Sequence, residues 1–160
     1  MGERLSRFGA GPTIASTAVI CAVLAGIASY EYPLVCLVPA LHHPVIEAFA
    51  WVLVAIGVVM WLAGAVTVMR AYNRDELVTS GVYTVVRHPM YAGWIVLILP
   101  GLTLLITAWP LLLAPLAAYA VFKQTIYRED EYLAKRFVRN YLDYRARVNE
   151  IVPIPRFRQG

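Results

Sequence analysis

Long stretches of the chain contain no Asp, Glu, Lys or Arg, and they restrict its possible folds more than any other feature. Residues 13–30 and 48–69 are uncharged, and the chain is uncharged again from 91 to 122. A helix of about 20 apolar residues crosses the hydrocarbon core of a bilayer, so the last stretch is longer than one crossing needs. Apolar residues make up 60% of the chain and charged residues 15%, whereas soluble domains have about 45–50% and about 25%. We therefore expect an integral membrane protein.

The third uncharged stretch divides into two helices. Trp109 and Pro110 interrupt it near its middle, where proline indicates a tight turn and tryptophan is typical of the membrane interface. The apolar segment 33–41 is short and bounded by prolines, so we expect it to form the end of the first helix and an interfacial loop. Residues 2–8 carry two arginines, but no small-residue cleavage site follows, so we do not expect a removable signal peptide. The predicted fold class is an all-α integral membrane protein with about four transmembrane helices, the last two forming a hairpin.

The basic residues all fall on one side of this layout. Arg4 and Arg7 precede the first span, Arg70, Arg74 and Arg87 follow the second, and the rest run from Lys123 to Arg158 after the hairpin. The loop 31–47 has His42 and His43 but no Lys or Arg. The positive-inside rule then predicts a multi-pass protein of the plasma or inner membrane with both termini in the cytoplasm. The net charge of +4 indicates contact with anionic lipid rather than nucleic acid, since no nucleic-acid motif accompanies it.

We expect one domain over residues 1–160, with a two-helix anchor in 1–70 and a ligand-binding core in 71–160. Aromatic and apolar residues recur in the charged tail at spacings of three and four: Tyr132, Leu133, Phe137, Tyr141, Tyr144 and Val148. This pattern predicts a C-terminal cytoplasmic amphipathic helix from about Ile126 to Val148, packed against the bundle and ended by Pro153 and Pro155. Cys21 and Cys36 have no metal-ligand spacing, so we expect buried thiols and no metal.

Polar residues that could support chemistry gather at two places. Arg87 and His88 come directly before Pro89, which begins a helix whose N-terminal N–H groups favour a carboxylate or phosphate. The second group is Arg128-Glu-Asp-Glu131 at the other end of the hairpin. Because the two ends of a hairpin are adjacent, a cationic and aromatic loop faces an acidic helix. The combination suits a ligand with an amino group, a carboxylate and a flat base, although headgroup anchoring and a solvated helix turn would explain the same composition.

Two motifs flank the hairpin. The first is Leu77-Val-Thr-Ser-Gly-Val-Tyr83 followed by Arg87-His-Pro-x-Tyr91-x-Gly93. The second is Glu129-Asp130-x-x-Leu133-x-x-x-Phe137-x-x-x-Tyr141-x-x-Tyr144-x-x-x-Val148, with Pro153 closing it. Together they resemble the isoprenylcysteine carboxyl methyltransferase and phospholipid methyltransferase superfamily over residues 69–155.

The resemblance implies an integral membrane enzyme that binds S-adenosylmethionine without a Rossmann domain. It also implies that the active site faces the cytoplasm, beneath a C-terminal helix and beside a lipid-side opening for a lipophilic acceptor. The implied cofactor-binding residues are Leu77, Val78, Tyr83, His88, Pro89, Met90, Tyr91 and Glu129. Arg70 resembles a family arginine near the reacting centre, and we assign predicted catalytic roles to Arg70 and Arg87. Thr125 and Arg128 are the predicted substrate-binding positions.

The sequence departs from the family pattern at three positions. Asp130 replaces the second residue of a Glu-Glu pair, which keeps the charge and shortens its reach. Val138 stands where a glycine usually follows the phenylalanine, so we expect a continuous helix there. Thr125 occupies the place of an arginine that prenylcysteine-methylating members carry, and a threonine cannot pair with a substrate carboxylate.

These departures leave more than one function open. The first is methylation of a lipidated acceptor, as in isoprenylcysteine carboxyl methyltransferases, and the second is N-methylation of a phospholipid amine. An amine would need a base, for which His88 and Glu131 are both candidates. A non-catalytic anchor subunit explains the spans but not the paired motifs. A transporter would carry ionisable residues at mid-membrane depth. Among the apolar residues near the centre of these spans, the only others are Ser, Thr and Gly.

Overall fold

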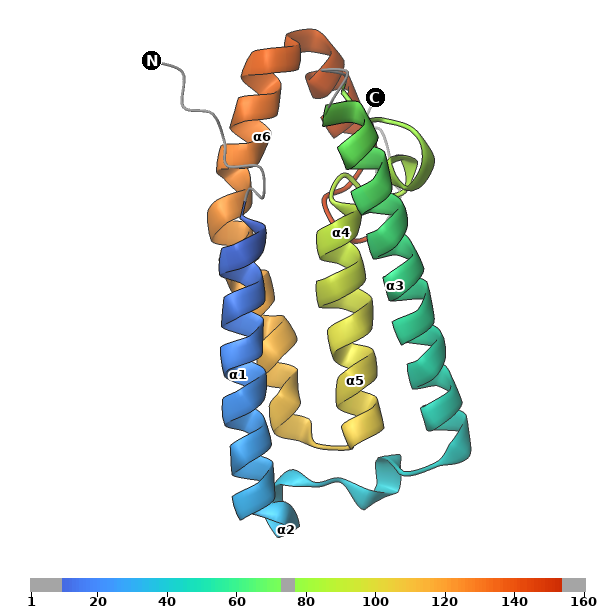
Figure 1. Ribbon diagram of the computed structural model, residues 1–160, viewed down its shortest axis with the longest axis vertical. Coiled ribbons are helices and arrows are strands. Elements are labelled where there is room, and N and C mark those ends of the chain that lie inside the picture. The colour runs from blue at the N-terminus through green and yellow to red at the C-terminus, as the bar shows by residue number, and fades with distance from the viewer. Residues whose placement is uncertain (1–9, 73–76, 154–160) are drawn as a thin grey trace.

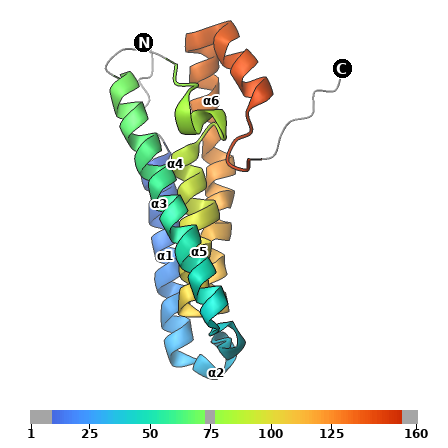
Figure 2. The ribbon, with the colours of Figure 1, turned by 90° about the vertical axis from the view of Figure 1, so that its right-hand side faces the viewer.

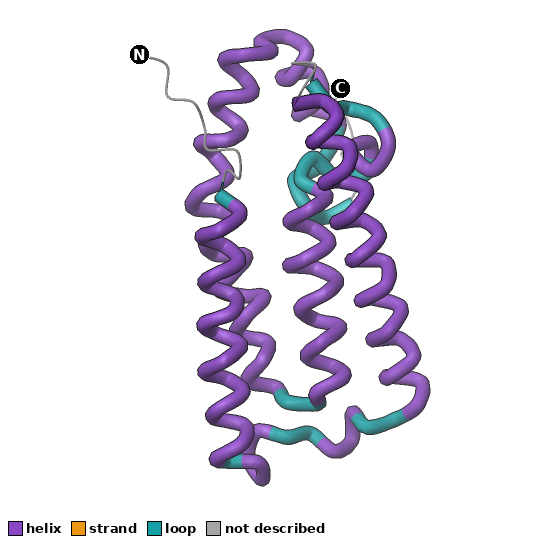
Figure 3. The backbone as a smooth tube through the Cα atoms, viewed as in Figure 1, coloured by secondary structure: helices purple, strands orange, loops and turns teal. Residues whose placement is uncertain are grey.

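The computed structural model describes residues 10–72 and 77–153, and the described part is a bundle of long helices (Figure 1). The long elements are α1 (Gly11–Glu31), α3 (Pro44–Tyr72), α5 (Leu99–Ile106) and α6 (Leu113–Arg147). The short helices α2 (Pro33–Cys36) and α4 (Pro89–Ala92) and the 3-10 turns η1 (Pro39–Leu41), η2 (Gly81–Thr84) and η4 (Trp109–Leu112) connect them. A π-helical turn, η3 (Gly93–Ile98), joins α4 to α5 without a break. No strand occurs in the described ranges (Figure 3).

Three of the described helices are long and apolar enough to cross a membrane: Gly11–Glu31, Pro44–Ala71 and Pro89–Ile106. At 1.5 Å per residue, α1 is about 31 Å long, which matches the hydrocarbon core of about 30 Å. Large apolar side chains on α1 and α3, such as Leu24 and Val59, are more than half exposed on the bundle surface. That surface suits lipid, so the chain is an all-helical membrane protein, as the sequence predicts. The count of four crossings stays a prediction.

The core lies where α1, α6 and the rod from α4 to α5 meet (Figure 2). Ile14 and Ala18 of α1 pack there against Phe122 and Ile126 of α6 and against residues of α4, η3 and α5. On the other side of that rod, α3 approaches through glycines. A Cβ on Gly93 would lie 2.6 Å from the carbonyl oxygen of Gly57, so these two backbones come as close as they do because both residues lack a side chain.

The hairpin turn forms where the sequence predicts it. Thr107 adopts a left-handed conformation (φ 56°), and η4 then leads into α6. At this end the loop after α1 meets the turn, since Val38 N–H donates to Thr107 O (2.8 Å) and Trp109 Nε1 donates to Val35 O (3.0 Å). Trp109 is half-exposed, which fits the predicted interfacial position.

The structure corrects the boundaries of the tail helix. No separate helix begins at Ile126, because α6 runs from Leu113 through the predicted hairpin helix and on to Arg147. The expectation of a continuous helix at Val138 is also wrong: Val138 has φ 39° and ψ −111°, and α6 bends there. The helix ends at Arg147 rather than at the prolines, since Val148 is extended. Pro155 lies outside the described residues.

Candidate active site at the polar cap

The functional motifs meet at one end of the bundle, in residues 77–92 and 123–153, which we call the polar cap. Residues 77–88, which we call the connector, lead from α3 to α4. The connector begins with Leu77 and Val78, which pack against Tyr83, Tyr141 and Tyr144. Gly81 starts η2 with φ +64°, a conformation that favours glycine. The buried Tyr83 hydroxyl donates to Gly64 O of α3 (3.4 Å), and Tyr144 Oη donates to Tyr83 O (2.7 Å). The connector is therefore held between α3 and the bent end of α6.

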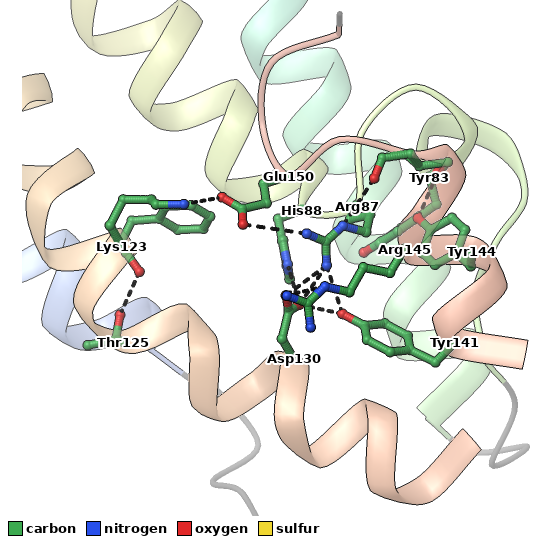
Figure 4. Close-up of polar contacts among 12 residues, drawn as sticks. Tyr83, Arg87, His88, Lys123, Thr125, Asp130, Tyr141, Tyr144, Arg145 and Glu150 are labelled. Carbon is green, nitrogen blue, oxygen red and sulfur yellow. Dashed lines mark hydrogen bonds and ion pairs between the residues drawn. The ribbon is translucent and has the colours of Figure 1, made fainter. Parts of the chain in front are cut away.

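Arg87 and Asp130 form a buried ion pair at the centre of the polar cap (Figure 4). Arg87 Nη1 lies 2.8 Å from both carboxylate oxygens of Asp130 and 3.0 Å from Tyr141 Oη, which itself donates to Asp130. His88 Nε2 lies 3.2 Å from Asp130 Oδ1. The side chains of Arg87 and Asp130 are 1% and 5% exposed, so each charge depends on the other for compensation.

The electrostatics follow from this geometry. Burial alone would raise the pKa of Asp130, but hydrogen bonds from His88, Arg87 and Tyr141 outweigh it and hold that pKa well below its usual range. Burial would lower the pKa of Arg87, whereas its hydrogen bond to Asp130 and the charge of that carboxylate raise it above its usual value. Burial, followed by the hydrogen bond to Asp130, raises the pKa of Tyr141, so its hydroxyl stays protonated and donates. Asp130 is thus an anion at any physiological pH.

Segment 148–151 folds back from α6 onto the residues before α4. The N–H groups of Arg87 and His88 donate to the carbonyl oxygens of Asn149 (2.7 Å) and Glu150 (2.9 Å), and Arg87 Nε donates to Val148 O (3.2 Å). Ile151 is buried in the core. Although a helix does begin at Pro89, these two backbone donors are therefore engaged by the chain itself rather than open to a carboxylate or phosphate.

A group of aromatic rings lies beside this network. The rings of His88, Tyr91 and Phe122 have centroids 5.4–6.0 Å apart, and they come from both ends of the hairpin. Glu129 lies near them with Oε2 buried and without a hydrogen-bond partner among the described residues. Burial raises the pKa of the Glu129 carboxyl. The charge of His88 and a hydrogen bond with Tyr91 oppose this rise, the charge of Asp130 adds to it, and the pKa of Glu129 is raised overall. A buried carboxylate oxygen without a partner is costly, and a hydrogen-bond donor from a ligand would satisfy it.

The structure brings most of the predicted site residues together, whereas the side chains of the other three are exposed or hydrogen-bonded within their own helix. Leu77, Val78, Tyr83, Arg87, His88, Pro89, Met90, Tyr91 and Glu129 all lie in the polar cap or against its edge. Arg70 is exposed in the last turn of α3. Thr125 Oγ1 donates to Val121 O of its own helix (2.7 Å), and Arg128 lies exposed over the Tyr127 ring. The catalytic and binding roles of all of these residues remain predictions.

Sequence reasoning missed Tyr141 and Glu150. Tyr141 was expected only as part of the aromatic stripe, and it contacts Asp130 because α6 bends at Val138 between the two residues. Glu150 follows the helix and carries no motif, yet its carboxylate lies 2.6 Å from Lys123 Nζ and 3.5 Å from Arg87 Nη2. No local signal in the sequence identifies either contact.

A cavity of about 270 Å³ lies on the surface of α6 beside Asp130. It is lined by Lys123, Ile126, Tyr127, Asp130, Glu131, Ala134, Arg145 and Glu150. None of the rings of His88, Tyr91 and Phe122 lines it, so it is separate from the aromatic group around Glu129. Across the described ranges, no group of three His, Cys, Asp or Glu side chains is arranged to hold a metal ion.

Comparisons with known proteins agree on one family. The "Protein-S-isoprenylcysteine O-methyltransferase" of Dictyostelium discoideum is 34% identical over 83 residues, which is 51% of this chain and 35% of that protein. The protein of the same name from Schizosaccharomyces pombe is 37% identical over 83 residues, with the same coverage. "Protein-S-isoprenylcysteine O-methyltransferase B" of Arabidopsis thaliana is 27% identical over 121 residues, or 70% of this chain and 61% of that protein.

The similarity thus spans about a third of the first two relatives and less than two thirds of the third. No solved structure matches the chain. The sequence model of the isoprenylcysteine carboxyl methyltransferase (ICMT) family matches residues 54–135, just over half of the 160 residues, and this region contains most of α3, the connector, the hairpin and the acidic turn of α6. The chain belongs to the isoprenylcysteine carboxyl methyltransferase family.

Proposed function

We propose that the protein is an S-adenosylmethionine-dependent methyltransferase that acts at the membrane on a lipid-like or lipidated acceptor. The family and the names of the relatives support methyl transfer. The observation that carries the proposal is the convergence of His88, Tyr91 and Glu129, which come from the two motifs. Glu129 Oε2 is buried there and has no hydrogen-bond partner among the described residues.

The residues present fit such a cofactor. Glu129 would accept hydrogen bonds from an amino or hydroxyl group, which its unpartnered Oε2 requires. Tyr83, Tyr91 and His88 would provide flat surfaces for a purine ring, and Leu77, Val78, Pro89 and Met90 would provide the apolar remainder. When bound, S-adenosylmethionine supplies an electrophilic methyl group on a sulfonium.

The chain itself would contribute placement and exclusion of water. Orientation of two reactants can supply up to about 7–11 kcal/mol of a barrier. The Arg87 and Asp130 network fixes the connector against α6 and so sets the distance between His88 and Glu129. A low-dielectric site also favours reaction of an anionic acceptor with a cationic donor, because charge is neutralised in that step.

Binding of S-adenosylhomocysteine to the detergent-solubilised protein, measured by calorimetry, tests the proposal. We expect His88→Ala and Glu129→Ala each to weaken binding at least tenfold, because each removes a ligand-facing group worth about 1.5–3 kcal/mol. Glu131→Ala is the matched control, since this nearby glutamate is exposed and paired with Lys135. If both site variants bind like the wild type, the proposed residues do not form the cofactor site. If the wild type itself does not bind, an anchor subunit becomes the better interpretation.

The proposed membrane arrangement has four crossings, with the uncharged first part of α6 as the fourth and residues 123–153 as an amphipathic cap in the cytoplasm. Within this single domain, residues 1–70 would form the membrane anchor and residues 71–160 the cofactor-binding core. The support is that α6 lies beside α1 and returns from the hairpin turn toward the end of the bundle where α3 ends and α4 begins (Figure 1). Single cysteines in the loop 42–47 should react with an impermeant reagent from outside the cell, and one at Arg145 should not; labelling of Arg145→Cys from outside would exclude this topology.

The acceptor is the least constrained part of the proposal. By the resemblance, Thr125 stands where prenylcysteine-methylating members carry an arginine, and its hydroxyl is engaged within α6. This weakens the assignment to a prenylcysteine carboxylate, so a phospholipid amine is a second candidate acceptor. His88, oriented by Asp130, would then be the better placed base, since Glu131 is exposed and paired with Lys135. We expect Thr125→Arg to improve use of a farnesylcysteine analogue about tenfold more than use of phosphatidylethanolamine, which corresponds to about 1.4 kcal/mol. Methyl transfer from tritiated cofactor to both acceptors measures this, and efficient methylation of the analogue by the wild type would contradict the argument from Thr125.

A further inference from the structure

The carboxylate of Glu150 lies between two cationic side chains, Lys123 and Arg87, which do not belong to a common sequence motif. Its Oε2 is 2.6 Å from Lys123 Nζ, and its Oε1 is 3.5 Å from Arg87 Nη2 (Figure 4). Lys123 belongs to α6, Arg87 to the connector and Glu150 to segment 148–151, so three separate parts of the chain form this arrangement. An arginine and a lysine on either side of a carboxylate are also the groups with which proteins hold carboxylate and phosphate ligands.

Arg87 provides a second, independent indication of a ligand. Its side chain is 1% exposed, its Nη1 is bound by Asp130 and Tyr141, and its Nε is bound by Val148 O. Its Nη2 is buried and has no hydrogen-bond partner among the described residues. A buried guanidinium nitrogen without an acceptor is costly, and the ion pair with Glu150 at 3.5 Å is too long to satisfy it as a hydrogen bond.

The arrangement lies at an open cavity near the end of the apolar bundle. Lys123 and Glu150 both line the cavity of about 270 Å³ beside α6, close to the lower size limit of about 300 Å³ for small-molecule pockets. Ile14, in the first turn of the candidate span α1, packs in the same cluster as Phe122 and Ile126. The end of α1 therefore lies level with Lys123, where lipid headgroups would meet the protein, and the exposed Tyr127 ring suits such an interface.

We propose that Lys123 and Arg87 form an anion-binding site for the phosphate or carboxylate of a lipid headgroup, and that Glu150 occupies this site in the ligand-free protein. An incoming anion would displace the Glu150 carboxylate into the cavity and bind Lys123 Nζ and Arg87 Nη2 in its place. No covalent step is involved, and the site does not depend on the proposed methyl transfer. Since Glu150 competes with the ligand, removal of its charge should strengthen anion binding.

The full-length protein in uncharged detergent can be titrated with short-chain phosphatidylglycerol, with phosphatidylcholine of the same chain length, and with inorganic phosphate. We expect phosphatidylglycerol to bind more tightly than phosphatidylcholine, Glu150→Gln to raise its affinity roughly threefold to tenfold, and Lys123→Met to lower it by a similar factor, as charge-assisted hydrogen bonds predict. Lys135→Met is the matched control. It removes another exposed lysine of α6 with an equally short ion pair (2.7 Å), and Lys135 does not line the cavity.

Glu150→Gln could also loosen segment 148–151, so thermal unfolding of each variant is measured alongside. The double variant Lys123→Met/Glu150→Gln should lose most of the gain seen with Glu150→Gln alone, because one of the two cations is gone. Phosphate that binds with the same variant pattern and competes with lipid would identify a soluble anion as the ligand source. Equal affinity of Lys123→Met and Lys135→Met, or weaker binding by a Glu150→Gln variant that unfolds at the wild-type temperature, would overturn the proposal.

Discussion

Where α3 contacts η3 and α5, the two surfaces meet through glycines and apolar side chains, whereas in the polar cap the segments meet through charged and hydroxyl groups. Gly57, Gly93 and Gly101 leave no space for a Cβ at the first interface. In the cap, Arg87 of the connector binds Asp130, which lies before the bend in α6, and Tyr141, which lies after it. The first region depends on small residues that allow close approach, and the second depends on charged and hydroxyl groups that pair with one another.

The difference shows how each region can fail. Close helix packing in lipid depends on small residues, because lipid tails are as apolar as the side chains and provide no hydrophobic drive between helices. A buried ionic network depends on every partner being present, because removal of one leaves an uncompensated charge. The membrane part should therefore be sensitive to added volume, and the cap to loss of a single charge.

The largest effect should follow removal of the Asp130 charge. Asp130→Asn keeps the shape of the side chain but leaves the buried Arg87 guanidinium without its main counter-charge, so we expect a loss of about 3 kcal/mol in unfolding free energy. Thermal denaturation in detergent measures this. Tyr141→Phe, which removes one hydrogen bond from the same network, should cost only about 1 kcal/mol.

The same network predicts a pH dependence. The pKa of Asp130 is lower in the folded protein than the value of about 3.9 in an unfolded chain. Its contribution is therefore fully present above pH 4 and is lost as the pH falls through the folded pKa. Wild type should lose stability in this acid range more steeply than Asp130→Asn, and parallel curves would contradict the role assigned to the ion pair.

A smaller effect is expected from added volume in the membrane part. In Gly93→Ala the new Cβ would lie 2.6 Å from the carbonyl oxygen of Gly57 and 3.3 Å from Trp61 N, and backbone atoms cannot rotate away. We expect a loss of about 1–3 kcal/mol, seen as a lower melting temperature. Gly26→Ala in α1 is the control. No atom lies within 4 Å of its Cβ position, so it should be neutral or stabilising by up to about 1 kcal/mol. Equal melting temperatures for the two variants would refute glycine packing at this interface.

The smallest effect concerns the bend that brings the cap together. Val138 has φ 39°, a conformation in which a β-branched residue is strained, and glycine would adopt it at no steric cost. We expect Val138→Gly to raise stability by about 1 kcal/mol, after allowance for the flexibility of glycine in the unfolded chain. Leu142→Gly, at a similarly exposed position in the helix after the bend, should lower stability by about 1 kcal/mol instead. A melting temperature that falls in both variants would indicate that Val138 is not strained.

The uncharged stretches determine the helical class, the spans over α1, α3 and the α4–α5 rod, and the hairpin turn at Trp109, because lipid requires every backbone group to be paired within a helix. The same reasoning placed a loop of Arg87 and His88 opposite the acids of α6, since the two ends of a hairpin must be adjacent. These inferences depend only on local composition and chain direction.

The detail within the cap depended on the tertiary structure. Which acid binds Arg87 is decided by helix rotation: Asp130 faces the guanidinium, while Glu129 lies near Tyr91 and His88. The bend at a valine, the contact of Tyr141 with Asp130 and the return of Glu150 to Lys123 have no periodic signal. The buried charges of Arg87 and Asp130 need partners from separate parts of the chain, and only the tertiary structure brings those parts together.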